Sequence, residues 1–193
     1  MWSPSSSVVA KSNQVRIIGG DWRSRRITFP DHEGLRPSAD RVRETLFNWL
    51  GQDLGGERCL DLFAGSGALG FEALSRGAAC VVMVEKSRVV CEALRRNAGL
   101  LAAKNLQLHC ADALEFATAA AADAAARFDV VFLDPPFGST LLAQAQQRVV
   151  PLLRPGARVY VESAAAFAPS GGWRILRHGR AGQVHYTLVT YGE

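Results

Sequence analysis

The sequence lacks the long apolar runs and paired metal ligands that mark several classes of protein. No apolar run approaches the roughly 20 residues that a helix needs to cross a bilayer. Residues 1–7 hold neither a charged n-region nor a long apolar segment, so we expect no secretory signal and a cytoplasmic location. The four cysteines form no Cys-x-x-Cys pair, and the four histidines form no metal-binding pattern. The sequence therefore predicts reduced structural thiols and no metal site.

The composition is that of a globular protein whose N-terminal quarter is basic. Apolar residues make up 48% of the 193 residues and charged residues 21%, which fits one α/β domain. Residues 1–44 contain eight Lys or Arg against five Asp or Glu, and carry most of the net charge of +4. Arginine binds phosphate groups well, so this stretch is suited to binding a polyanion. A solvated basic face without a partner would show the same charge.

The first quarter of the chain predicts an extension ahead of the main domain. Residues 1–14 are rich in serine and aperiodic, which predicts a disordered tail. Short β-type runs at residues 15–18 and 26–29 predict a hairpin or bent ribbon. Ser38 is predicted to cap a helix that ends near Gly51. We therefore divide the chain into a tail (1–14), a ribbon-plus-helix extension (15–56) and a main domain (57–193).

After residue 57, short apolar strands alternate with helical patterns. The predicted strands are residues 59–63, 80–85, 106–110, 128–134 and 158–162, with helices at 68–76, 88–103, 113–126 and 141–153. This alternation predicts a parallel sheet with helices on both faces. Two last strands, at 173–176 and 184–191, have no helix between them. The expected fold is a doubly wound, mostly parallel seven-stranded sheet that ends in an antiparallel hairpin.

Acidic residues end four successive strands of this pattern, at the edge where ligands of such sheets collect. They are Asp61, Glu85, Asp112 and Asp134. Residues 61–70 also contain a Gly-x-Gly-x-x-Gly loop, which alone fits NAD(P) enzymes as well as other nucleotide binders. Because a pyrophosphate avoids a nearby carboxylate, Asp61 favours a nucleoside that bears an ammonium group.

S-adenosylmethionine has such an ammonium, together with a ribose and an adenine. Asp61, Glu85 and Asp112 could meet these three groups in that order. The structural alternatives are that Asp61 binds amides of the glycine loop, and that Glu85 and Asp112 only cap helices.

The most informative tetrapeptide is Asp134-Pro135-Pro136-Phe137, directly after a buried strand. The Asp134 carboxylate and the Pro135 carbonyl can each accept one N–H of an exocyclic amine on a base. This would align the nitrogen with a sulfonium methyl, while Phe137 offers a stacking face worth roughly 1–3 kcal/mol. The alternative is a proline-rich strand exit with a core phenylalanine.

Together, these motifs resemble the class I S-adenosylmethionine-dependent methyltransferases whose (Asn/Asp)-Pro-Pro-(Tyr/Phe) motif serves methylation of exocyclic amines. The segments at residues 16–20, 23–26, 34–38 and 40–50 resemble, more narrowly, the RsmD family. That family methylates N2 of guanine 966 in bacterial 16S rRNA. The resemblance runs from about residue 15 to residue 186. Two positions depart from it: Ser24 stands where the family has glycine, and Phe137 where tyrosine is common in the wider branch.

The resemblance implies direct methyl transfer, with S-adenosylhomocysteine as product and neither a covalent enzyme intermediate nor a metal. It implies catalytic roles for Asp134, Pro135, Pro136 and Phe137. The implied cofactor contacts are Asp61, Phe63, Ala64, Gly65, Ser66, Gly67, Glu85, Lys86, Asp112, Ala113 and Asp134. The expected RNA contacts are Arg23, Arg25, Arg26, Arg36, Arg41 and Arg43, although Arg41 or Arg43 could instead pair with Glu44 or Asp40.

The implied partner is 16S rRNA in a partly assembled small subunit, with no membrane contact, and a monomer is expected. Three other functions compete with this interpretation. One is amino methylation of another substrate, either adenine N6 of DNA or a protein glutamine. Another is an NAD(P)-binding oxidoreductase, which would leave the turn at Pro135-Pro136 unexplained. The last is an inactive RNA-binding module, which the intact acidic residues disfavour.

Overall fold

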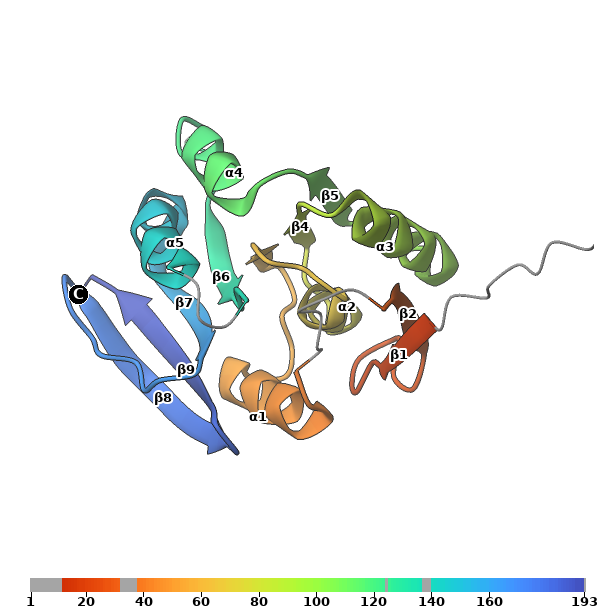
Figure 1. Ribbon diagram of the computed structural model, residues 1–193, viewed down its shortest axis with the longest axis horizontal. Helices are drawn as coiled ribbons and strands as arrows, with labels where there is room; N and C mark the ends of the chain where they lie inside the picture. Colours follow the sequence, from red (N-terminus) through yellow and green to blue (C-terminus); the bar gives the residue numbers. More distant parts are fainter. Residues whose placement is uncertain (1–11, 32–37, 124, 137–139, 193) are drawn as a thin grey trace, which may run out of the picture.

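The architecture comes from a computed structural model that describes residues 12–31, 38–123, 125–136 and 140–192. A seven-stranded sheet with the order β5-β4-β3-β6-β7-β9-β8 forms the centre (Figure 1). Its strands are β3 (Arg58–Asp61), β4 (Cys80–Glu85), β5 (Leu106–Cys110), β6 (Phe128–Leu133), β7 (Leu153–Ser163), β8 (Trp173–Ala181) and β9 (Val184–Tyr191). All neighbours up to β7 pair in parallel, and β9 pairs antiparallel with both β7 and β8. The predicted fold class is confirmed.

Helices cover both faces of this sheet. The helices are α1 (Asp40–Leu50), α2 (Ala68–Ser75), α3 (Arg88–Leu101), α4 (Ala113–Ala120) and α5 (Leu141–Val149), with a short 3-10 turn, η1 (Val150–Leu152). Side chains of α1, α2 and α3 share one hydrophobic core, and those of α4 and α5 share the other. Strand β6 contributes Val130 and Phe132 to the first core, and Val131 and Leu133 to the second. The unbroken apolar run at residues 130–133 of β6 therefore reflects burial on both faces of the sheet.

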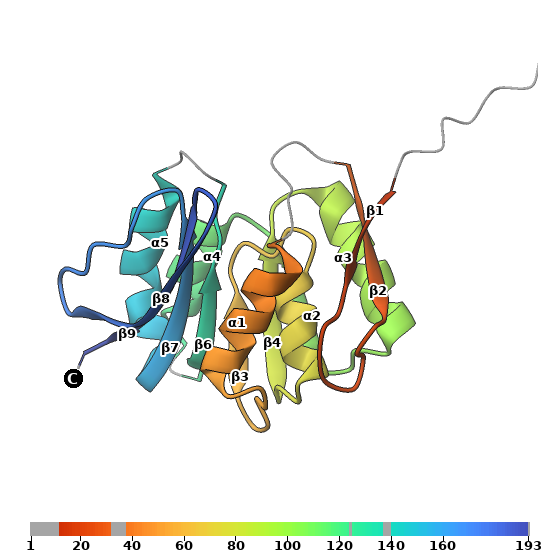
Figure 2. The ribbon, with the colours of Figure 1, turned by 90° about the horizontal axis from the view of Figure 1, so that it is seen from below.

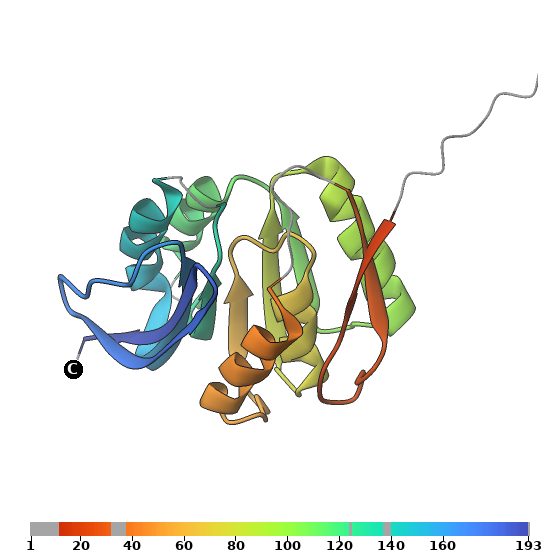
Figure 3. The ribbon, with the colours of Figure 1, turned by 60° about the horizontal axis from the view of Figure 1, so that its bottom comes forward.

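Before α1, strands β1 (Ser12–Arg16) and β2 (Arg26–Pro30) form a separate antiparallel ribbon alongside α3 (Figure 3). Thr28 and Asn97 of α3 exchange two hydrogen bonds, of 3.1 and 2.8 Å. Strand β1 begins at Ser12, inside the segment 1–14 that was predicted to be disordered, because Asn13 and Gln14 pair with β2. The extension also shares the core of α1, α2 and α3, since Ile17 and Ile27 are buried in it.

The turn between β1 and β2 is fixed to the end of α2. The Asp21 N–H donates to the Ser75 carbonyl at 2.8 Å. A side chain at Gly20 would lie 1.8 Å from that carbonyl oxygen, and the φ of Gly20 is +72°, so glycine is required there. Ser24 adopts a φ of 68°, a conformation that favours glycine, which is the residue that the resemblance led us to expect there.

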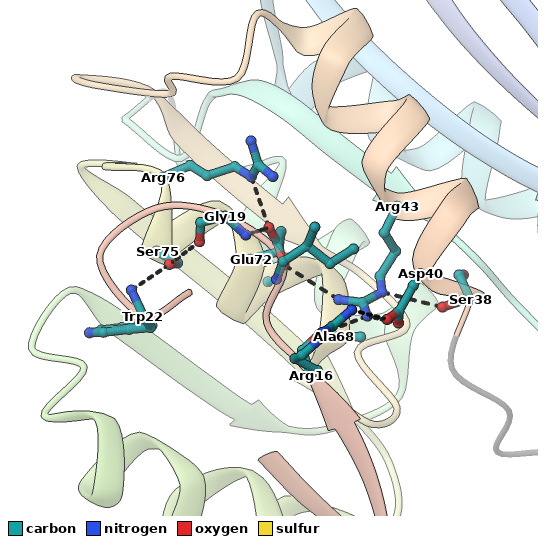
Figure 4. A network of polar contacts seen from close by, with 12 residues as sticks. Arg16, Gly19, Trp22, Ser38, Asp40, Arg43, Ala68, Glu72, Ser75 and Arg76 are labelled. Atoms are coloured by element: carbon teal, nitrogen blue, oxygen red, sulfur yellow. Dashed lines mark hydrogen bonds and ion pairs between the residues drawn. The ribbon is translucent and has the colours of Figure 1, made fainter. Parts of the chain in front are cut away.

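A buried ion-pair network holds the extension to the main domain (Figure 4). The two carboxylate oxygens of Glu72 accept the backbone N–H groups of Ile18 and Gly19, both at 2.8 Å. The same carboxylate pairs with Arg76 at 2.9 Å and with Arg43 at 3.4 Å. The side chains of Glu72 and Arg43 are fully buried, so their charges are compensated inside this network, by each other and by Arg76 and Asp40.

The remaining expectations concern the cap of α1, the cysteines, membrane-spanning helices and metal ligands. Ser38 does not cap α1, since the N-cap is Ala39 and the Ser38 hydroxyl bonds instead to Glu162. The four cysteines are unpaired and three are buried, whereas Cys110 is exposed. Within the part of the chain that the structure describes, no helix is long and apolar enough to cross a membrane, and no cluster of three metal-ligating side chains occurs.

Candidate active site

A cavity of about 450 Å³ opens at the carboxyl ends of the parallel strands. It lies where the chain order reverses, because β4 and β5 extend from one side of β3 and β6 and β7 from the other. Most of the predicted cofactor and substrate contacts line it, namely Asp61, Phe63, Ala64, Gly65, Ser66, Glu85, Lys86, Asp112, Ala113, Asp134, Pro135 and Pro136. The glycine loop and the Asp-Pro-Pro turn therefore share one cavity.

Two predicted site residues are not seen in the cavity wall, one because it lies behind it and one because it is outside the described residues. Gly67 is not in the cavity wall and forms the N-cap of α2 with a φ of 80°. A side chain there would lie 2.6 Å from Leu94, so this glycine allows α2 to pack closely on α3. Phe137 lies outside the described residues, and its stacking role stays a prediction.

Asp61 is almost fully buried, with 2% of its surface exposed to solvent. Its Oδ2 accepts the Gly70 N–H at 3.0 Å, as the structural alternative expected. Burial raises the pKa of Asp61 from 3.8 to about 7; the Gly70 hydrogen bond opposes this rise and the charge of Glu85 adds to it. A cationic ligand in the cavity would compensate the buried carboxylate.

The acids at the ends of β4 and β5 also bind backbone amides. Glu85 accepts the N–H of Gly65 at 3.1 Å through Oε2, and that of Ser87 at 2.7 Å through Oε1. Asp112 caps α4, because its Oδ1 accepts from Leu114 at 2.8 Å and from the next residue at 3.2 Å. Both acids therefore hold the backbone around the cavity in place, and both line the cavity.

A second pair of acids lies at the ends of β6 and β7. Leu133 pairs with Val161, so Asp134 and Glu162 follow at the same level of two adjacent parallel strands. The Ser38 and Tyr160 hydroxyls donate to Oε2 of Glu162 at 2.7 and 2.8 Å. Burial, and then the negative charges of Glu162 and Asp61, raise the pKa of Asp134 well above its ordinary value, while Ser38 opposes the rise.

Sequence reasoning missed Ser38 and Glu162 as residues of the cavity. A signal for Glu162 was present, because it ends the predicted strand 158–162 just as the four recognised acids end theirs. Ser38 gave no comparable signal, since it contacts Glu162 across 124 positions of the chain.

The predicted RNA contacts separate into different parts of the surface. Arg43 is wrong as a contact, because its side chain is fully buried and its Nη2 lies 2.6 Å from Asp40. Arg23 and Arg25 are exposed but lie in the β1–β2 turn, near the ends of α2 and α3 that are remote from the cavity (Figure 2). Exposed predicted contacts elsewhere are Arg26 on β2 and Arg41 on the first turn of α1. Arg36 lies outside the described residues.

The edge strand β8 carries a basic surface that sequence reasoning did not assign. Arg174, Arg177 and Arg180 are exposed and make no ion pair with any described residue. The sequence contains no acidic residue from position 164 to position 192. Because β8 runs in the same direction as β7, Arg180 lies near the edge of the sheet that carries the cavity.

Comparison with known proteins places the chain among relatives of similar length. A family described as conserved hypothetical protein 95 matches residues 15–190. The ribosomal RNA small subunit methyltransferase D of Escherichia coli strain K12 is 43% identical over 182 residues, which cover 92% of this chain and 90% of the relative. This chain belongs to the RsmD family. The Haemophilus influenzae Rd protein of the same name is 40% identical over 179 residues, covering 91% and 93% of the two chains.

Solved structures agree with this membership of the RsmD family. A structure described as the putative methyltransferase yhhF from Escherichia coli has a TM-score of 0.82 and 41% identity, covering 93% of this chain and 99% of its own. The Thermus thermophilus 16S rRNA N2 G1207 methyltransferase RsmC, in complex with AdoMet and guanosine, has a TM-score of 0.72 at 23% identity. It covers 98% of this chain and 52% of its own, and at that identity it shows the fold alone. The RsmD-family chain has the class I methyltransferase fold.

Proposed function

We propose that this protein transfers a methyl group from S-adenosylmethionine to the exocyclic N2 of guanine 966 in 16S rRNA. The observation that carries the proposal is the shared cavity, which joins Asp61, Glu85 and the Asp134-Pro135 turn. Transfer between a bound donor and a base needs both sites in one cleft, because the reacting atoms must approach to about 3–3.5 Å. The names of the relatives, which are ribosomal RNA small subunit methyltransferases, support rRNA as the substrate.

The cavity fits the cofactor through the chemistry of its acids. Asp61 is a buried carboxyl with a raised pKa, so it suits the ammonium of the methionine end. Glu85 would hold the ribose hydroxyls, and Asp112 the adenine side. When bound, S-adenosylmethionine supplies an electrophilic sulfonium methyl. A buried acid beside the glycine loop disfavours the pyrophosphate of NAD(P), so an oxidoreductase fits this cavity less well.

The Asp-Pro-Pro turn would orient the amine and remove its proton. Asp134 Oδ and the Pro135 carbonyl accept the two N–H groups of N2, which directs the nitrogen lone pair out of conjugation with the ring. Once methylated, the nitrogen carries an extra proton, which the Asp134 carboxylate can accept because its raised pKa makes it a stronger base than an ordinary carboxylate. The target base has to leave its stack to reach the cavity, at a cost of a few kcal/mol unless the RNA presents it in a loop.

The rRNA would bind across exposed arginines of the protein, of which Arg180 lies near the edge of the sheet that carries the cavity. Arg26 and Arg41 keep their predicted role, and we add Arg174, Arg177 and Arg180 of β8. Arg23 and Arg25 would contact RNA only if it extends along α2 and α3. The proposed substrate is a partly assembled small subunit, which bacteria build in the cytoplasm, and the proposed active form is a monomer.

The test is to map methylated nucleotides in small-subunit rRNA from a strain in which the gene is deleted. We expect N2 methylation of one guanine to be lost, and to return when the wild-type gene is restored but not with the Asp134→Ala variant. Purified protein with labelled S-adenosylmethionine should then methylate subunits from the deletion strain. Unchanged rRNA methylation in the deletion strain would refute the proposal.

A further inference from the structure

Glu162 is a buried acid of the cavity to which the mechanism above assigns no role. It is 7% exposed and lines the cavity beside Asp134. Its Oε2 already accepts two hydroxyl donors, from Ser38 and Tyr160. Among the contacts of the described residues, its Oε1 accepts none. One oxygen is therefore fixed by the protein, while the other is available to a ligand that brings a hydrogen-bond donor.

The sheet register places this oxygen near the group that would hold the amine. Asp134 and Glu162 come directly after the paired residues Leu133 and Val161, on strands about 4.8 Å apart. Both side chains lie on the face of the sheet that carries α1, since Phe132 and Tyr160, which stand two residues before them, belong to that core. The two carboxylates therefore face one ligand edge side by side.

We infer that Glu162 makes the enzyme selective for guanine by accepting its N1–H, while Asp134 holds N2; this inference rests on the proposed function. The Watson–Crick edge of guanine presents N1–H and the N2 amine next to each other, and both groups are hydrogen-bond donors. Adenine presents its N6 amine beside an unprotonated N1, whose lone pair would face the Glu162 carboxylate. A site built to accept a hydrogen bond rejects a ligand that lacks the donor, because the buried oxygen is then left unpaired. Ser38 and Tyr160 are positioning residues that fix the carboxylate.

The experiment replaces the target guanine with 2-aminopurine in the rRNA substrate that the wild-type protein methylates. This base keeps the 2-amino group but lacks N1–H and O6. We expect the wild-type protein to prefer guanine by roughly a hundredfold or more in kcat/KM. In Glu162→Gln, the amide can donate to the unprotonated N1, so the preference should fall by at least roughly tenfold. The missing O6 affects both proteins alike and cancels in this ratio of preferences.

Matched variants separate recognition from folding. Asp134→Asn should slow the methylation of guanine and of 2-aminopurine to a similar extent. Glu92→Gln, at an exposed position of α3, should change neither rate. Ser38→Ala and Tyr160→Phe, each of which removes one of the two hydroxyl donors to Oε2, should lower the preference for guanine while leaving the affinity for S-adenosylmethionine within a few-fold. An unchanged preference in a folded Glu162→Gln protein would overturn this inference alone. Failure of the wild-type protein to methylate any guanine would instead refute the proposed function.

Discussion

The buried carboxyl of Asp61 makes cofactor binding depend on pH in a calculable way. Its pKa is raised to about 7, and only the ionised form can pair with the ammonium of S-adenosylmethionine. Well below pH 7, each further unit of pH decrease should weaken binding about tenfold, because a proton must leave Asp61 when the cofactor binds. Between pH 5.5 and pH 7.5 the Kd should fall roughly 25-fold.

Calorimetric titration of the wild-type protein with S-adenosylmethionine across this pH range measures the effect. Repeating it in buffers with different ionisation enthalpies counts the protons released, which should approach one per cofactor below pH 6. The matched control is Asp61→Asn, which keeps the size of the side chain and should bind weakly at a Kd independent of pH. A wild-type Kd that stays constant between pH 5.5 and pH 7.5 would refute this role of Asp61.

The raised pKa of Asp61 also affects the stability of the cofactor-free protein. Here the pH trend is the opposite of that for binding, because stability falls as the pH rises. Because the folded state holds this proton more tightly than the unfolded state, the contribution of Asp61 to the free energy of unfolding is full below pH 3.8 and is lost as the pH rises to about 7. The loss is on the order of 4 kcal/mol, since each pKa unit corresponds to about 1.4 kcal/mol. The difference between wild-type protein and Asp61→Asn in urea unfolding should change with pH accordingly.

Three further predictions concern other parts of the molecule. Asp134→Ala should abolish methyl transfer while calorimetry finds cofactor affinity within a few-fold of wild type; near-normal turnover would exclude Asp134 from the mechanism. Arg43→Ala should lower the free energy of urea unfolding by about 3 kcal/mol, because Glu72 loses a buried partner, and a loss below about 1 kcal/mol would contradict that account. Neutralising the three β8 arginines should weaken rRNA binding and reduce its salt slope by about 2, while an equal charge change at the amino ends of the parallel strands should not. The β8 variant changes Arg174, Arg177 and Arg180 to Gln, and its control changes Lys104, Arg127 and Arg154 to Gln.

The sequence predicts best those features that depend on residues close together in the chain. The glycine loop and the Asp134-Pro135 turn each follow an apolar strand directly, so their place at the carboxyl edge follows from strand direction alone. The alternation of strands and helices predicts the sheet for the same reason. The boundary of β1 was less predictable, because its first residues are held by pairing with β2 rather than by an apolar pattern.

Contacts between segments that are distant in the chain could not be predicted from the sequence pattern. Arg43 occurs in a run of charged residues typical of a solvent-exposed helix face, but α2 brings Glu72 against it and buries both. Ser38 stands where an N-cap is expected, yet β7 places Glu162 within hydrogen-bond distance of its hydroxyl. In both cases the partner comes from another layer of the fold, which a periodic pattern does not encode.

The most direct measurement of the central claim is a crystal structure of the protein with S-adenosylhomocysteine and a guanosine nucleotide. Our account predicts the amino-acid end of the product at Asp61 and the guanine edge against Asp134 and Glu162. The guanine N2 should point at the sulfur, leaving room for one methyl group between them. Binding of the two ligands in separate clefts, or a guanine turned with its N2 away from Asp134, would contradict it.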